Sequence, residues 1–187
     1  MADATYELSP NARWAIYGPN PYSDLKGTKL SIVNTRTGRI HRAWDEDELL
    51  AYCWSEDSTR FAYLNSTLRV KVIDLSAEPS VKDIAKLDFP LKERRFSDVG
   101  SDLSMSWSPN GEILGILWDD HTVDWSERKY RVALVNIRTR AVSVIVYADV
   151  KKPNEAVSAR GTHPVPVWGP GGERLFWPPG PENRSAR

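Results

Sequence analysis

The side chains best suited to chemistry lie close together late in the sequence. Three carboxylates and one imidazole occur at Asp119, Asp120, His121 and Asp124. Oxygen and imidazole donors can hold a divalent cation. However, these residues directly follow an apolar run, so a hairpin loop would carry them, and acidic residues are ordinary in solvated loops. The cluster also lacks the ligand spacing and the glycine of a calcium loop, so we expect no metal and no other cofactor.

Other catalytic arrangements are missing from the sequence. It contains no Gly-x-Ser-x-Gly and no His-Glu-x-x-His motif. The single cysteine, Cys53, lies in an apolar run, where a buried and inert thiol is expected rather than a nucleophile. His41 and His163 flank expected strands and have no recognisable catalytic partner. We therefore expect a protein that is not an enzyme.

The composition indicates a globular chain that binds neither nucleic acid nor a membrane. Among its 187 residues, 25 basic and 25 acidic side chains give no net charge, so a basic footprint for nucleic acid is absent. No apolar run approaches the roughly 18 residues of a membrane helix, and the amino terminus does not resemble a secretory signal, so we expect a cytoplasmic protein. Eight tryptophans against four phenylalanines favour a large core or a protein interface.

One short phrase recurs four times along the chain. Its copies begin at Ser9, Trp54, Trp107 and Trp168, and the third reads Trp-Ser-Pro-Asn-Gly-Glu-Ile-Leu-Gly-Ile. The matching residues Ser9, Ser55, Ser108 and Gly169 are 46, 53 and 61 residues apart. A period of this size is typical of proteins built from repeated structural units.

Each phrase predicts a β-hairpin, because proline, asparagine and glycine suit a tight turn between two antiparallel strands. The sequence around the phrases predicts further strands by its β-branched runs. The expected first and second strands are 50–54, 60–64, 103–107 and 113–118, the third strands are 29–34, 68–74 and 130–136, and the fourth strands are 39–44 and 141–147. Segment 81–87 is more polar, so it could be an exposed edge strand or a short helix.

These phrases resemble the TolB-type, WD40-like β-propeller repeat. The matching stretches are Trp107-Ser-Pro-Asn-Gly111, Trp54-Ser-Glu-Asp57, Val72-Ile-Asp-Leu75 and Ile32-Val-Asn-Thr-Arg-Thr-Gly38. The resemblance implies an all-β, propeller-like fold with about three complete four-stranded antiparallel blades plus a partial fourth. We place the repeat units at approximately 4–45, 49–90, 102–148 and 163–180, within a single domain, 1–187.

The partial fourth unit leaves the expected fan of blades unfinished, since propellers usually close with about four to eight blades. Three explanations are open. Two chains could complete one ring as a homodimer, a different protein or the chain's own loops could cap an open fan, or the sequence could be part of a longer chain. Each of the first two would cover apolar surface that soluble proteins avoid exposing.

The absence of a catalytic motif favours a non-enzymatic protein-binding module or scaffold. Long connections between strands often carry function, and aromatic and basic side chains suit a protein contact. The candidate contact residues are Phe89, Arg94, Arg95, Phe96, Trp125 and Trp177. Two alternatives are a ligand- or metal-binding propeller enzyme, with its site at the ring centre or at residues 119–124, and a small inhibitor or immunity-type protein.

Overall fold

The regular structure of this protein is built from β-strands. The computed structural model describes residues 4–19, 31–42, 49–76, 79–88, 103–120, 127–146, 150–151, 167–169, 172 and 175–176. Within these residues there is no helix, and hence none long and apolar enough to cross a membrane.

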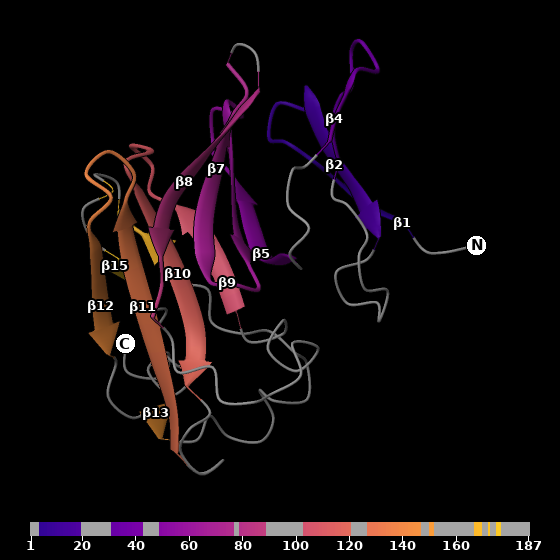
Figure 1. Ribbon diagram of the computed structural model, residues 1–187. Helices are drawn as coiled ribbons and strands as arrows, with labels where there is room; N and C mark the ends of the chain where they lie inside the picture. The colour runs from indigo at the N-terminus through magenta and orange to yellow at the C-terminus, as the bar shows by residue number, and fades with distance from the viewer. Residues whose placement is uncertain are drawn as a thin grey trace, which may run out of the picture.

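Among the described residues, three antiparallel sheets each contain four strands in sequence order, and we call them blades 1, 2 and 3 (Figure 1). Blade 1 consists of β1 (Ala4–Leu8), β2 (Trp14–Pro19), β3 (Ser31–Asn34) and β4 (Ile40–Arg42). Blade 2 consists of β5 (Leu49–Trp54), β6 (Arg60–Asn65), β7 (Arg69–Asp74) and β8 (Ser80–Lys86). Blade 3 consists of β9 (Leu103–Trp107), β10 (Ile113–Asp120), β11 (Glu127–Asn136) and β12 (Val142–Val146).

Two smaller elements complete the described structure. The short strand β13 (Val150–Lys151) pairs with the beginning of β11. The strands β14 (Val167–Trp168) and β15 (Leu175–Phe176) form the hairpin that begins a fourth unit. The all-β fold with three full blades and a partial fourth is therefore confirmed.

The strands agree with the sequence predictions except at a few points. The polar segment 81–87 forms the edge strand β8 and not a helix, because its backbone pairs with β7 along its length, with one irregularity between Val70 and Lys71. Strand β11 begins at Glu127 and not at residue 130. Strand β13 was not predicted, since two residues are too few to leave a pattern.

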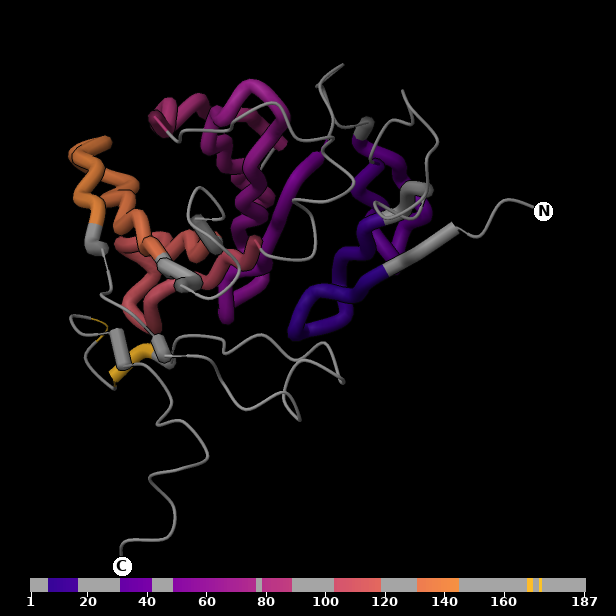
Figure 2. Tube along the Cα trace, turned by 90° about the horizontal axis from the view of Figure 1, so that it is seen from below, coloured from indigo at the N-terminus to yellow at the C-terminus, as the bar shows by residue number. Residues whose placement is uncertain are grey.

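The blades lie side by side in the order of the sequence. Figure 2, a view at right angles to Figure 1, shows blade 2 between the other two blades, with the β14–β15 hairpin beside blade 3. The first strands of blades 2 and 3, β5 and β9, lie against each other. This order places each blade against its predecessor in the sequence.

The core lies between the blades, so blade 2 is covered on both faces. One cluster joins blade 1, through Trp14, Ile16 and Ile32, to blade 2. A second cluster joins blade 2 to blade 3. Successive residues of a strand point to opposite faces, so Phe61 belongs to the first cluster and its neighbour Ala62 to the second. Double coverage explains why β6 is almost continuously apolar.

Candidate functional site

The repeated turns between the first two strands of each unit share one backbone geometry. In each turn the fourth residue donates its N–H to the carbonyl of the first residue, at 2.7–2.9 Å. That fourth residue has a positive φ in every copy: Ala12 at 56°, Ser58 at 59°, Gly111 at 66° and Gly172 at 69°. The tight turns that the sequence predicts are therefore confirmed, and two of them hold a residue other than glycine in the left-handed region.

A serine and a following Asn or Asp hold three of these turns together. In the second turn, Ser55 donates its hydroxyl to Asp57 Oδ1 at 2.7 Å and accepts the Arg60 N–H at 2.9 Å. The first turn, with Ser9 and Asn11, and the third turn, with Ser108 and Asn110, repeat this pair of bonds. All three serines are buried. The Ser-x-Asx pattern in the sequence therefore builds the turn, and does not supply catalytic groups.

The turns also contact one another along one end of the fan. The Asn11 N–H donates to Ser58 Oγ at 3.0 Å, which joins the first turn to the second. Arg60 donates from Nη1 to the Gly111 carbonyl at 2.8 Å, which joins the second to the third. A Cβ added at Gly172 would lie 3.1 Å from Asn110, so the fourth turn packs against the third.

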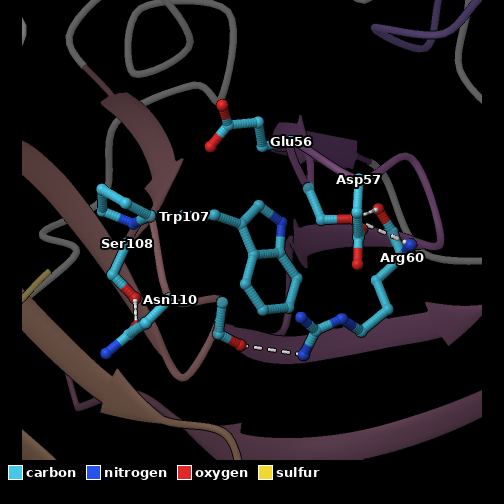
Figure 3. A pocket seen from close by; sticks show the side chains of 9 residues that line it. Glu56, Asp57, Arg60, Trp107, Ser108 and Asn110 are labelled. Atoms are coloured by element: carbon cyan, nitrogen blue, oxygen red, sulfur yellow. Dashed lines mark hydrogen bonds between the residues drawn. The ribbon is translucent and has the colours of Figure 1, made fainter. Parts of the chain in front are cut away.

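A small pocket opens between the second and third turns (Figure 3). Its volume is about 230 Å³, which is below the roughly 300–1,000 Å³ of typical small-molecule sites. The pocket is lined by Ser55, Glu56, Asp57, Arg60, Trp107, Ser108, Pro109, Asn110 and Gly111.

Arg60 occupies one wall of this pocket and binds the two blades together. Its guanidinium carbon lies 4.6 Å from the centre of the Trp107 ring, a cation–π contact (Figure 3). The same guanidinium bonds to the carbonyl of Gly111, and a Cβ on Gly111 would overlap with it. Glycine at position 111 is therefore favoured by its positive φ, which Ala12 and Ser58 also adopt in the equivalent turns, and by the close approach of Arg60.

The carboxylates of the pocket are poorly suited to acid–base catalysis. The hydroxyl of Ser55, the backbone N–H of Thr59, the Thr59 hydroxyl and the charge of Arg60 together hold the pKa of Asp57 below its usual value. A carboxylate with a lowered pKa is a weak general base. The other carboxylate, Glu56, is exposed. The pocket therefore supplies polar binding groups and the edge of an aromatic ring.

A second candidate surface lies on blade 1, on the face that points away from blade 2. Strand pairing aligns Leu8, Ala15, Val33 and Ile40 in one row across all four strands. Residues directly opposite in antiparallel strands share a face, and this face is opposite to that of Trp14 and Ile32. Leu8 is 50% exposed and Ile40 60% exposed, while the two residues between them are half-buried. An apolar row therefore faces solvent.

The equivalent rows of blades 2 and 3 are covered at their centres. Blade 2 has Trp54, Phe61, Ile73 and Val81 at these places, and blade 3 has Trp107, Leu114, Val135 and Val142. The two central residues of each row are fully buried. In the repeat, Leu8 replaces the tryptophan of the other three copies. Sequence reasoning missed this surface. Starting the first copy of the repeat one residue earlier, at Leu8, would have shown that a leucine occupies the place of the tryptophan.

Most of the candidate residues named from the sequence lie outside the described residues. These are His121, Asp124, Phe89, Arg94, Arg95, Phe96, Trp125 and Trp177. Asp119 and Asp120 end strand β10, where they pair with Tyr130 and Lys129 of β11. Within the described part of the chain, no group of three or more His, Cys, Asp and Glu residues could hold a metal ion. The metal and contact sites at these positions stay predictions.

The remaining candidates have structural surroundings. Cys53 is half-buried against the core between blades 2 and 3. Burial, followed by the charge of Glu7, strongly raises the pKa of its thiol, so the reactive thiolate is disfavoured. His41 contacts Trp14 edge-on, with ring centres 5.8 Å apart. Trp118 is buried in the core between blades 2 and 3.

Two of the three repeat tryptophans donate a hydrogen bond to the preceding blade. Trp107 donates its indole N–H to the Cys53 carbonyl at 3.4 Å, and Trp168 donates to Ser106 Oγ at 3.0 Å. Trp168 also lies so close to Gly115 that a Cβ there would be 3.0 Å from the indole ring. Trp54 packs against Phe61, with ring centres 4.9 Å apart. The three tryptophans therefore have a structural role in the fold.

Blades stacked through these tryptophans define a partial β-propeller, and solved structures agree with that class. No protein-family model matches the chain, and no curated protein matches it. The chain is similar to the acylaminoacyl peptidase of Pyrococcus horikoshii, with a TM-score of 0.57 and 13% identity over 89% of this chain and 26% of that one. It is also similar to the Cps50 (Swd1) β-propeller domain of Myceliophteria thermophila, with a TM-score of 0.54 and 13% identity over 95% and 51%.

The tricorn protease is a third similar structure, with a TM-score of 0.53 and 13% identity over 89% of this chain and 14% of that one. The chain thus spans about half or less of the length of each of these proteins. At such low identity the likeness shows the β-propeller fold and not a shared activity.

Proposed function

We propose that this chain is a non-enzymatic protein-binding module with TolB-type repeats, and that the open face of blade 1 contacts its protein partner. The observation that carries the proposal is the exposed apolar row of Leu8, Ala15, Val33 and Ile40. Rows at the same place in blades 2 and 3 are covered by a neighbouring sheet. Contiguous apolar surface of this kind marks an interaction site.

The chemistry of the row favours a protein over a small ligand. Its aliphatic side chains span four strands of a sheet and offer no group that would orient a small polar molecule. Small-molecule sites are instead concave, with a few convergent polar groups. The turn pocket has such groups, but the Asp57 carboxylate and the Arg60 guanidinium are already bonded within the fold.

Site-specific photo-crosslinking tests this proposal. A photoreactive amino acid would replace Leu8 or Ile40 in the full chain, and Arg138 in the exposed turn of blade 3 would serve as the control position. We expect protein adducts from positions 8 and 40 but not from position 138. The double substitution Leu8→Asp and Ile40→Asp should abolish partner binding with little loss of stability, because both side chains are at least half exposed.

Two results would refute the proposal. One is an adduct yield at positions 8 and 40 no higher than at position 138. The other is unchanged binding of the identified partner by the double variant. Turnover of a small substrate by the purified chain would instead support the enzymatic alternative.

A further inference from the structure

The outer edge of blade 3 differs from the outer edge of blade 2. Strand β12 is the last strand of its sheet, and among the described residues it pairs with β11 alone. Its sequence is Val-Ser-Val-Ile-Val, without a charged residue. Val142 is 39% exposed and Val144 is 51% exposed. Both lie opposite buried residues, Val135 and Ala133, so they continue the core between blades 2 and 3 outward to solvent.

The hydrogen-bond register shows which backbone groups face outward. The Asn136 N–H donates to the Ala141 carbonyl at 2.9 Å, so residues 136 and 141 form a hydrogen-bonded pair. Hydrogen-bonded and non-hydrogen-bonded pairs alternate along antiparallel strands. Ser143 and Ile145 therefore direct their backbone groups toward β11. Val142, Val144 and Val146 direct theirs to the outer edge, which pairs with no other strand among the described residues and can accept one.

The corresponding edge of blade 2 is protected by charge. Strand β8 carries Lys82, Asp83 and Lys86. Asp83 bonds to Arg69 at 2.7 Å, and Lys82 lies 3.8 Å from Asp74. Charged side chains on an edge strand oppose pairing with a further strand. Strand β12 has no such protection.

We propose that β12 is a self-association edge, on which the β12 strand of a second copy of this chain pairs antiparallel. The sequence of the strand is symmetric in its valines about Val144. An antiparallel pair centred there places Val144 opposite Val144 and Val142 opposite Val146. No like charges meet, whereas β8 paired with itself about its centre would oppose two copies of Asp83.

The second copy would make one continuous sheet through blade 3 of both chains. A two-fold axis through Val144 generates an isologous dimer, which closes without further growth. This inference is independent of the proposed function, because blade 1 contributes no residue to the β12 edge.

The sharpest test is Val144→Pro, measured by sedimentation over a range of protein concentrations. Proline removes the outward N–H of residue 144 but no bond to β11, and edge strands accept proline at such places. In the symmetric pair, the change deletes both hydrogen bonds that the two Val144 residues exchange. We expect a wild-type dimer and roughly 5- to 150-fold weaker association of the variant, from about 0.5–1.5 kcal/mol for each of the two lost bonds.

Three further variants control the test. Val144→Thr keeps the N–H and the β-branched shape, so it should retain the dimer. Val144→Lys adds the charge that protects β8, so it should weaken association. The double variant Leu8→Asp and Ile40→Asp should leave this dimer intact, which separates failure of the proposal from failure of the proposed function. Circular dichroism and thermal unfolding confirm that each variant is folded.

Three results would overturn the inference. The wild-type chain could be a monomer at every concentration, its dimer could be unaffected by Val144→Pro, or the dimer could be lost through Leu8 and Ile40 instead. If a monomeric wild-type chain binds a fluorescent peptide of residues 141–147 and the proline variant does not, the edge accepts an added strand but a second folded copy of the chain is not its occupant.

Discussion

Blades 1 and 3 present the same sheet face in opposite surroundings. In blade 3 the row that begins at Trp107 is covered by blade 2, and its central residues Leu114 and Val135 are fully buried. In blade 1 the equivalent row begins at Leu8, which is 50% exposed. Both rows are apolar. The exposure of a repeat position therefore depends on the sheet that lies beside it, and not on the type of residue alone.

The largest expected effect tests this difference in coverage directly. We expect Leu114→Ala to cost about 2–5 kcal/mol of unfolding free energy, because it leaves a cavity between two blades. The matched change Leu8→Ala should stay within about 0.5 kcal/mol, as for exposed positions. Urea unfolding of both variants measures the difference. Equal losses would mean that Leu8 is covered in the free chain, and would remove the basis for an open face.

A smaller effect compares two turns that each hold a left-handed glycine, of which the Gly111 turn bonds to a neighbouring blade. Gly111 and Gly38 have nearly the same φ, 66° and 68°, but a Cβ would meet Arg60 only at Gly111 and nothing within 4 Å at Gly38. Gly38→Ala should therefore cost only the strain of a left-handed residue, about 1–2 kcal/mol. Gly111→Ala should cost about 1 kcal/mol more, because Arg60 must leave the Gly111 carbonyl and the Trp107 ring.

Thermal and urea unfolding of the two alanine variants provide the measurement. Adding Arg60→Ala sharpens it, since without the guanidinium the two glycine substitutions should become equivalent. A difference between them that persists in the Arg60→Ala background would show that the turn itself, and not the link between blades 2 and 3, sets the cost.

Local sequence features predicted the elements of this fold well, and contacts between distant residues poorly. The turn at Ser108 follows from residues that are adjacent in the chain, so the hairpin could be read directly. The segment 81–87 remained ambiguous because it carries the charged residues that protect a sheet edge. These residues interrupt the apolar pattern of a strand, so the segment also resembles a polar helix. The bond of Arg60 to Gly111 spans 51 residues, and neither residue indicates the other.

The candidate surfaces were harder to predict for the same reason. A row such as Leu8 to Ile40 is formed by strand register, and its exposure requires knowing which blade lies on each side. The sequence instead directed attention to long connections rich in aromatic and basic residues. Those connections lie outside the described residues, so their role in binding stays a prediction.

The smallest expected effect concerns pH, and it compares the second turn with the first and third. Bonds from Ser55 and Thr59 lower the pKa of Asp57 in the folded protein, while the equivalent residues Asn11 and Asn110 do not titrate. A lowered folded pKa contributes stability above the unfolded value of about 3.9, and that contribution is lost as pH falls through the folded pKa.

Asp57→Asn keeps an Oδ1 acceptor and removes the titration. We therefore expect the difference in urea midpoint between wild type and Asp57→Asn to be constant above about pH 5 and to shrink as the pH falls below the unfolded pKa and through the lowered folded pKa of Asp57. Asp74, whose pKa is also lowered, titrates in both proteins and cancels from the difference. A difference that stays constant down to pH 2 would show that the Asp57 carboxylate gains nothing from the turn, and that the three turns are equivalent.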